Sequence, residues 1–280
     1  MFLFAAAFLF STGGAAIKAC SLGSWQIAGF RAGIAGLTLW LLLPNARRGW
    51  TRRTWLIGMT YAATLVLFVL ANKLTSSANA IFLQSTAPLY LLLLGPLVLR
   101  EPIRSIDIAV IVAIAAGAFF LLSGAERIGA TAPDPRRGNL FGLFSGLTWA
   151  ITLTGLRWMG KRSEAGESAE SVVISGNFVA FAACLPMALP VSHFAFADIT
   201  ILLYLGVFQI GLAYMALTRS IRHVPGLEAA TLLLIEPVFN PIWTWLVHGE
   251  RPGALTLLGG SLIILAAFAG IWWQNRAERP

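Results

Sequence analysis

One acidic side chain, Glu236, lies inside an apolar stretch where a helix facing lipid would not tolerate it. The stretch from Leu232 to Pro252 reads LLLIEPVFNPIWTWLVHGERP, so the carboxylate is followed at once by Pro237 and then by Pro241. A charged side chain inside a hydrophobic span is costly unless it faces a cavity or a partner. Each proline also removes a backbone hydrogen bond. These residue types indicate a site at which a carboxylate could hold an ammonium group or a proton.

Side chains that share a helical face with Glu236 extend this candidate site. At about 100° per residue, Ala229, Asn240 and Trp243 fall on the stripe of Glu236. Polar and aromatic stripes in three other apolar stretches would add amphipathic walls that suit the side chain and the cationic group of an amino acid. The predicted substrate-binding residues are Tyr61, Thr64, Phe68, Asn79, Gln84, Thr86, Tyr90, Ser145, Trp149, Thr152, Glu236, Asn240 and Trp243. The alternative is that the Ser and Thr side chains only join helices, and that Glu236 only fixes packing.

Composition places these residues in a membrane protein. The chain of 280 residues is 58% hydrophobic and 11% charged, with a mean hydropathy of +0.77, whereas about a quarter of a soluble domain is charged. The net charge of +8 falls in short loops between apolar stretches and not in a basic helix suited to nucleic acid. Cys20 and Cys184 lie in or next to apolar segments and are expected to be free buried thiols.

Ten apolar stretches are long enough to cross about 30 Å of hydrocarbon as helices. We therefore expect an all-α integral membrane protein with ten transmembrane helices. Most Lys and Arg residues fall in loops on the side of the N-terminus, so both termini are predicted to be cytoplasmic. The predicted spans are 2–19, 25–43, 55–71, 77–98, 104–123, 139–158, 170–190, 198–217, 226–247 and 253–273.

An internal repeat relates the two halves of the chain. A shift of 149 positions aligns Pro88 with Pro237 and Glu101 with Glu250. Because each half holds an odd number of spans, the second half would cross the membrane in the opposite sense, as an inverted-topology repeat around a central cavity. The predicted organisation is a first five-helix repeat over 1–123, a linker over 124–138 and a second five-helix repeat over 139–280.

Pro88 and Pro237 are predicted to break their helices near the middle of the membrane. Pro88 leaves the carbonyl of Gln84 without its helical donor, and Pro237 does the same for Leu233. Unpaired backbone at that depth is tolerated inside protein or beside water. We therefore expect the two breaks to line the cavity, and the alternative is a pair of kinks whose backbone is satisfied locally.

Three further charged groups have simpler interpretations. Arg31 lies early in its span, and its side chain is expected to reach the loop or the lipid headgroups rather than substrate. Glu101 and Glu250 each precede a proline at the start of a span, where a carboxylate complements the helix dipole. Both are expected to act as caps.

The paired segments resemble the EamA family of the drug/metabolite transporter superfamily. Each of these segments carries a mid-span proline and ends in a Glu followed by Pro within two residues. In addition, Lys18 ends the first span and Arg31 lies early in the second. The similarity covers essentially the whole chain, and within the superfamily it is greatest to YddG-type amino acid exporters. The resemblance implies a ten-helix carrier that exports amino acids, including aromatic or other neutral ones, or related metabolites across the bacterial inner membrane by alternating access. Ala87 stands where the other half has Glu236, so a role for that carboxylate belongs to one half.

Enzymatic functions find no support in the sequence. The three histidines, His193, His223 and His248, are scattered, and the chain has neither a phosphate-binding Gly-rich loop nor a Gly-x-Ser-x-Gly turn. We expect no cofactor and no metal, and as partners a small-molecule substrate and lipid, with the protein a monomer or homodimer. The alternatives are an uptake or exchange carrier of the same fold and, less favoured, an intramembrane enzyme.

Overall fold

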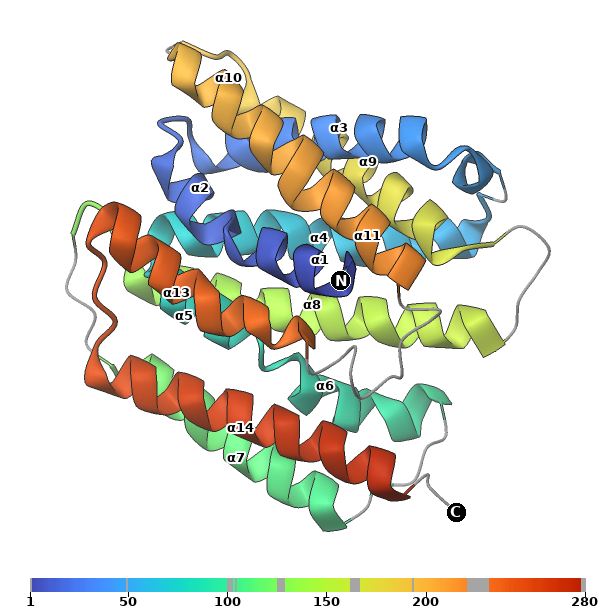
Figure 1. Cartoon of the computed structure of the whole chain (residues 1–280), viewed down its shortest axis with the longest axis vertical. Coiled ribbons are helices and arrows are strands. Elements are labelled where there is room, and N and C mark those ends of the chain that lie inside the picture. The colour runs from blue at the N-terminus through green and yellow to red at the C-terminus, as the bar shows by residue number, and fades with distance from the viewer. Residues whose placement is uncertain are drawn as a thin grey trace.

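The fold is a bundle of helices (Figure 1). The computed structural model describes residues 2–48, 50–99, 103, 105–124, 129–161, 167–192, 194–220 and 232–277. Its helices are α1 (Phe2–Ser11), α2 (Gly13–Ala19), α3 (Ser24–Leu42), η1 (Pro44–Arg47), α4 (Arg52–Leu74), α5 (Ser77–Gln84), α6 (Ala87–Leu94), η2 (Gly95–Leu99), α7 (Ser105–Ser123), α8 (Pro135–Lys161), α9 (Ala169–Ala188), α10 (Phe196–Leu203), η3 (Tyr204–Leu212), α11 (Ala213–Ser220), α13 (Ile235–His248) and α14 (Ala254–Ala277). Of these, η1 is a 3₁₀-helix, and η2 and η3 are π-helical.

Consecutive helices join into ten segments within the described residues, at the positions of the ten predicted spans. Eight of these segments are long and apolar enough to cross a membrane. The other two are α3, which carries Gln26 and Arg31, and α13, which has 14 residues. The spanning segments are Phe2–Ala19, Arg52–Leu74, Ser77–Val98, Ser105–Ser123, Pro135–Met159, Ala169–Ala188, Phe196–Leu217 and Ala254–Trp273.

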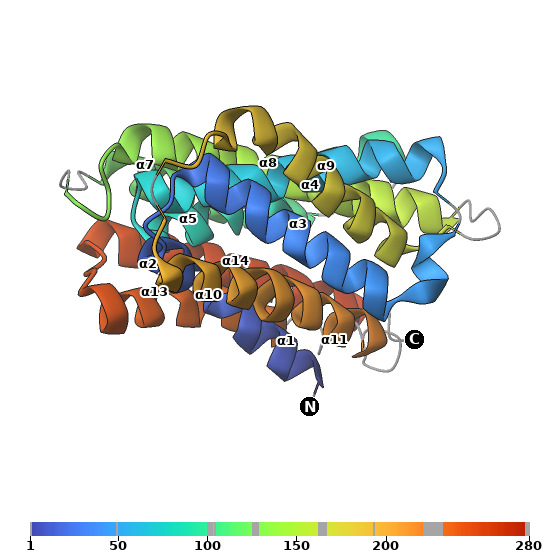
Figure 2. The same ribbon diagram turned by 90° about the horizontal axis from the view of Figure 1, so that it is seen from above.

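The helices of the two halves of the chain interleave (Figures 1 and 2). In the internal repeat, α1 corresponds to α8, α4 to α11 and α5 to α13. Accordingly, α4 and α5 pack on α8 as α11 and α13 pack on α1. Likewise α4 packs on α9 as η3 packs on α3. Two pairs, α3 with α9 and α7 with α14, join equivalent helices of the two halves. The packing is therefore nearly unchanged when the halves are exchanged.

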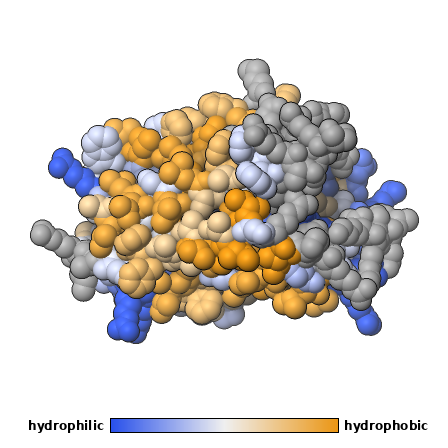
Figure 3. Space-filling view, turned by 90° about the horizontal axis from the view of Figure 1, so that it is seen from below, coloured by the Kyte–Doolittle hydropathy of each residue, from blue (hydrophilic) through white to orange (hydrophobic). Residues whose placement is uncertain are grey.

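The outer surface of the bundle is apolar between two polar ends. Figure 3 shows hydrophobic residues across the middle of one face and hydrophilic residues gathered at both ends. Among the exposed side chains are Phe4, Leu97, Phe119, Phe196 and Leu246, each more than half exposed. Such a surface is stable only against lipid, so the chain is an integral membrane protein. Cys20 and Cys184 are free and buried, as predicted.

Two helix breaks lie at equivalent positions of the described chain. The first separates α5, which ends at Gln84, from α6, which has Pro88 in its first turn. The second is a turn at Leu234, after which α13 begins with Glu236 and Pro237 in its first turn. Proline fits a first turn because the backbone N–H that it lacks would have no helical acceptor there.

Gly146 of α8 lets this helix pack directly on the first break. A Cβ atom at this position would lie 3.0 Å from the carbonyl oxygens of Leu83 and Gln84 and 3.0 Å from Thr86 Oγ1. These carbonyls belong to the turn in which the helical hydrogen bonds are interrupted, so they cannot move aside without disturbing it. The close approach therefore depends on glycine.

We predict that Gly146→Val destabilises the protein by about 1–3 kcal/mol through overpacking. The matched control is Gly270→Val in α14, where a Cβ would meet Val110 methyl carbons at 3.4 and 3.6 Å, which is ordinary contact. Both variants carry the same change in helix propensity, so the difference between them reports packing. Thermal unfolding of the detergent-purified proteins measures the difference. Equal melting temperatures would show that the close packing of α8 on the break between α5 and α6 does not depend on glycine at position 146.

Candidate functional site

A cavity of about 670 Å³ lies between the helices. This volume is typical of small-molecule sites, which combine apolar walls with a few polar groups. Apolar side chains from α4, α5, α6, α8 and α11 make up most of the wall. Its polar and aromatic lining residues include Phe10, Arg31, Tyr61, Thr64, Gln84, Ser85, Trp149, Gln209, Tyr214 and Glu236.

The predicted substrate-binding residues divide into two groups by position. The residues that line the cavity are Tyr61, Thr64, Phe68, Gln84, Trp149 and Glu236, together with the helix-break residues Pro88 and Pro237. The residues that do not line it, within the described structure, are Asn79, Thr86, Tyr90, Ser145, Thr152, Asn240 and Trp243. Contact with substrate remains a prediction for the residues of both groups.

The stripe expected along α13 reaches the cavity only through its first turn. Trp243 instead donates a hydrogen bond from Nε1 to Ser11 Oγ over 3.0 Å, and Asn240 packs against Gly14. Both contacts arise because α1 and α2 cover the later turns of α13, so residues on one helical face meet different surroundings along its length. Ala229 lies outside the described residues.

Most of the other polar residues away from the cavity are held by neighbouring helices. Ser145 Oγ accepts a hydrogen bond from Gln84 Nε2 over 2.8 Å and therefore orients an amide that does line the cavity. Thr152 Oγ1 bonds Thr60 Oγ1 over 2.9 Å. Thr86 Oγ1 donates to the carbonyl of Leu83, and Asn79 Nδ2 donates to Asn139 Oδ1. These contacts fix helices in place, as Ser, Thr and Asn often do in membranes.

Four aromatic rings form a continuous wall of the cavity, which we call the aromatic wall. Trp149 of α8 lies against Tyr61 of α4 with ring centroids 6.3 Å apart. Tyr61 meets Tyr214 of α11 edge to face at 5.6 Å, and Tyr214 meets Phe10 of α1 edge to face at 5.0 Å. Such pairs contribute about 0.5–1.5 kcal/mol beyond their buried area. The wall is therefore rigid and amphipathic.

Arg31 contributes a guanidinium group to the cavity, contrary to the sequence interpretation. Its side chain does not extend to a loop or to headgroups, because Arg31 lies two turns into α3 and is only 2% exposed. Its Nη2 donates to the carbonyl oxygen of Leu65 over 3.1 Å. The early position in the span suggested a route to water, but α4, α9 and η3 all pack on α3 and enclose the side chain.

Sequence reasoning also missed other lining residues, among them Gln209, Tyr214, Asp107 and Arg157. Gln209 is 5% exposed and lies in the π-helical segment η3. A lone glutamine within the apolar run VFQIGL was the signal that could have identified it. Tyr214 gave no such signal, because tyrosine near a span end is also typical of an interfacial anchor.

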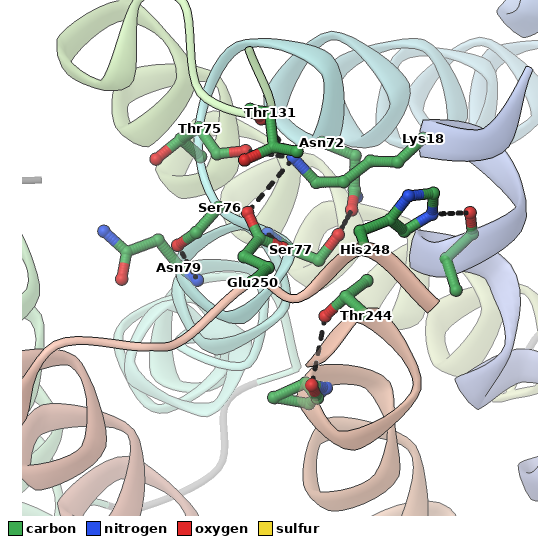
Figure 4. A network of polar contacts seen from close by, with 12 residues as sticks. Lys18, Asn72, Thr75, Ser76, Ser77, Asn79, Thr131, Thr244, His248 and Glu250 are labelled. Atoms are coloured by element: carbon green, nitrogen blue, oxygen red, sulfur yellow. Dashed lines mark hydrogen bonds and ion pairs between the residues drawn. The ribbon is translucent and has the colours of Figure 1, made fainter. Parts of the chain in front are cut away.

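One end of the bundle is closed by a buried ion pair (Figure 4). Lys18 Nζ lies 3.3 Å from Glu250 Oε1, and the two side chains are 3% and 7% exposed. Lys18 also donates to the backbone carbonyls of Thr75, over 2.9 Å, and of Thr131. Glu250 Oε2 accepts from the backbone N–H of Ser77 over 3.1 Å. Glu250 therefore caps α5 rather than the helix that it precedes, α14. Glu101 lies outside the described residues.

Further hydrogen bonds surround this ion pair, and we call the whole set the closed-end network. Ser77 Oγ donates to Asn72 Oδ1 over 2.8 Å, and Thr75 Oγ1 donates to Asn139 Oδ1 over 2.7 Å. His248 Nε2 lies 2.9 Å from the carbonyl oxygen of Ala15. These contacts join α2, α4, α5, α8 and the connection between α13 and α14. Both halves of the chain therefore contribute to closure.

The cavity extends toward the opposite end of the bundle. Its lining there includes Ile103, which is 52% exposed, and the exposed Arg157 near the end of α8. Leu217 and Ile271, near the ends of α11 and α14, also line it. Asp107, in the first turn of α7, is 6% exposed and lines the same region. The cavity therefore communicates with the end that lies away from the closed-end network.

A helical membrane bundle that holds a polar cavity, closed at one end and reaching exposed residues at the other, defines a membrane transport protein. The chain belongs to the EamA-like transporter family, which matches residues 1–123 and 136–271. It is a transporter and not an enzyme.

Similar proteins agree with this assignment. Over 276 residues the chain is 27% identical to the pseudopaline exporter CntI of Pseudomonas aeruginosa strain UCBPP-PA14, covering 94% of this chain and 92% of the relative. The protein of the same name from strain PAO1 is 26% identical with the same coverage. A solved crystal structure of a protein 18% identical in sequence superimposes with a TM-score of 0.66, covering 99% of this chain and 97% of that one. The last comparison shows a common fold.

We predict that Glu250→Gln lowers stability by about 3–5 kcal/mol, because it leaves the buried Lys18 ammonium without its counter-charge. The control is Asp134→Asn, which removes a surface ion pair to Arg137 with exposed partners and is expected to cost about 0–1 kcal/mol. Thermal unfolding in detergent measures both. Equal effects of the two variants would show that the buried pair does not hold the closed end together.

Proposed function

We propose that this protein is a secondary transporter that exports amino acids or related metabolites across the bacterial inner membrane by alternating access. The observation that carries the proposal is the cavity itself, which lies between the two halves of the chain, is closed by the closed-end network and reaches exposed residues at the other end. Alternating access requires such a site, reachable from one side of the membrane at a time.

The two halves act in this proposal as inverted repeats, with the first over 1–123, the linker over 124–138 and the second over 139–280. The exchange symmetry of the helix packing supports this arrangement, because α8 packs on α4 and α5 as α1 packs on α11 and α13. The equivalent breaks at Pro88 and Pro237 support it further. Rocking of one half against the other would then open and close the two ends in turn.

Both termini are proposed to lie in the cytoplasm. The start of α1 and the end of α14 point toward the same end of the bundle in Figures 1 and 2, and that is the end to which the cavity extends. In this orientation the closed-end network faces the extracytoplasmic side. The structure then corresponds to an inward-facing state, in which an exporter binds substrate from the cytoplasm.

The residue types around the cavity favour an amino acid or a similar metabolite as substrate. Glu236 supplies a carboxylate, and the aromatic wall supplies surface for an apolar or aromatic side chain. The exporter named for pseudopaline is a related protein whose cargo is a metabolite, which supports outward transport of a small molecule. More specifically, we propose that the protein exports amino acids, as YddG-type exporters do.

We predict that purified protein in liposomes carries labelled neutral or aromatic amino acids, with the highest flux for aromatic ones. Flux that responds to an imposed pH gradient would indicate proton coupling, and Glu236→Gln should then abolish the response because the amide cannot titrate. Empty liposomes and liposomes with the surface variant Asp134→Asn serve as controls. The absence of flux for every amino acid tested, in either direction, would overturn the proposed substrate class.

We predict that Cys20 reports opening of the closed end. Burial raises the pKa of the Cys20 thiol to about 11, so at pH 7.5 it is protonated and reacts slowly with maleimides. Opening would expose the thiol, return its pKa toward about 8.5 and increase the thiolate fraction. In a Cys184→Ala background, Glu250→Gln should therefore accelerate labelling by an impermeant maleimide, from outside intact cells, by about tenfold or more. Asp134→Asn should not, and labelling only from the cytoplasmic side would contradict the orientation.

A further inference from the structure

Four arginines gather in the connection between α3 and α4. Residues 44–55 read PNARRGWTRRTW and hold Arg47, Arg48, Arg52 and Arg53 without an acidic residue. The first three are exposed, and Arg53 is half-buried. The connection lies at the end of the bundle at which α14 also ends, which is the end that the cavity reaches (Figure 1). We call residues 44–55 the arginine connection.

The backbone of the arginine connection is packed firmly against the bundle. Trp50 Nε1 donates to the carbonyl oxygen of Ala46 over 2.8 Å, and the Trp50 ring meets that of Trp55 edge to face at 5.2 Å. The same carbonyl accepts from Ser171 Oγ over 3.1 Å, which ties the connection to α9. The segment that carries the arginines is therefore preorganised.

Two of the arginines are engaged by neighbouring side chains and carbonyls. The guanidinium of Arg47 lies over the Trp40 ring, 4.2 Å from its centroid, and Nε donates to the Trp40 carbonyl oxygen over 2.6 Å. Arg53 Nη1 lies 3.9 Å from Glu167 Oε2, and its guanidinium lies over the ring of Trp158. These contacts hold the connection in place and leave the other two arginines to face outward.

Arg48 and Arg52 form no hydrogen bond or ion pair with the described residues. Arg52 is also the first residue of α4, and no acidic residue lies in the first turn of that helix. A helix dipole disfavours cations at this end. The helix itself therefore gives no reason for an arginine here, whereas an anion outside the protein would.

The internal repeat shows that the fold does not require these arginines. The equivalent connection, between α9 and α10, covers 189–195, reads LPVSHFA and contains no Lys or Arg. It lies at the closed end, where Ser21 Oγ donates to Asp198 at the start of α10. Two equivalent helix pairs thus differ in charge according to the end of the bundle at which they turn. The arginines therefore serve the surroundings of one end.

The surface beside the arginine connection faces hydrocarbon. Leu37 and Leu41 of α3 and Leu56 of α4 are each more than half exposed. Trp40 and Trp55 are exposed next to them, and exposed tryptophans of this kind mark the boundary between hydrocarbon and headgroups. A ligand that fits both surfaces has an anionic head and apolar chains. A soluble anion would use only the arginines.

We propose that the arginine connection binds the phosphate headgroup of an anionic phospholipid, with Arg48 and Arg52 as its receptors and the exposed faces of α3 and α4 as the seat of its acyl chains. Guanidinium groups bind phosphate through parallel hydrogen bonds, which give direction as well as energy. Basic clusters next to transmembrane helices attract anionic lipids by the same charge complementarity. This binding does not depend on which substrate the cavity carries.

The test is competition between lipids for the detergent-purified full chain, with bound lipid counted by native mass spectrometry. The probes are dioleoylphosphatidylglycerol and dioleoylphosphatidylcholine, which have the same chains but differ in net charge. We expect the first bound lipid to be phosphatidylglycerol by about 30-fold, as two arginines near a lipid surface would give. Equal retention of the two lipids, or displacement of phosphatidylglycerol by equimolar inorganic phosphate, would overturn the proposal.

A matched pair of double variants separates this site from the overall charge of the protein. Arg48→Gln with Arg52→Gln should lose most of the 30-fold preference. Arg136→Gln with Arg137→Gln removes the same charge from exposed positions at the start of α8, at the closed end, and should keep the preference. Equal losses in both double variants would overturn the proposal.

A charge-conserving variant tests whether the loss reflects packing instead. Arg48→Lys with Arg52→Lys should keep most of the preference for phosphatidylglycerol, because the positive charge remains while the planar fork is lost. Its melting temperature without added lipid should match that of the glutamine variant, since neither side chain has a partner in the described structure. A loss of preference as large as that of the glutamine variant would assign the effect to packing and overturn the proposal.

Discussion

The ion pair between Lys18 and Glu250 is the interaction on which the arrangement of the bundle depends. It joins the end of the first helical segment to the connection before the last one. Lys18 also donates to the carbonyls of Thr75 and Thr131, and Glu250 accepts from the backbone N–H of Ser77. Within hydrocarbon every such group needs a protein partner. A single pair of charges therefore closes one end of the cavity and bonds backbone groups at the end of α4, at the start of α5 and in the connection before α8.

The fold was largely predictable from the sequence, because hydrocarbon imposes a simple rule of length and apolarity. The ten described helical segments lie at the positions of the ten predicted spans, and eight of them are long and apolar enough to cross a membrane. The predicted proline positions coincide with the two helix breaks. The membership of the EamA-like family also followed from the repeated proline and Glu segments. These features are local, and a short window of sequence contains all the information that they need.

The cavity was less predictable, because its composition depends on depth along each helix. Asn240 shares a helical face with Glu236 but meets α2 instead of the cavity, and a helical-wheel argument does not record where a neighbouring helix begins. Arg31, in contrast, was expected to reach a loop or the headgroups but lines the cavity. Its distance from the start of α3 suggested access to water, but whether α4, α9 and η3 enclose it is a property of tertiary packing. Glu250 likewise caps a helix more than 170 positions away, α5 at Ser77, which no local pattern encodes.

The π-helical segment η3 has a consequence for the aromatic wall. A wide turn accommodates extra residues, and each extra residue rotates the helix that follows by about 100°. The segment Tyr204–Leu212 precedes α11, so it sets the direction in which Tyr214 points. Return of η3 to ordinary α-helical pitch would rotate Tyr214 away from Tyr61 and open the wall without any change in the tilt of a helix. The shape of the cavity thus depends on the winding of this one segment.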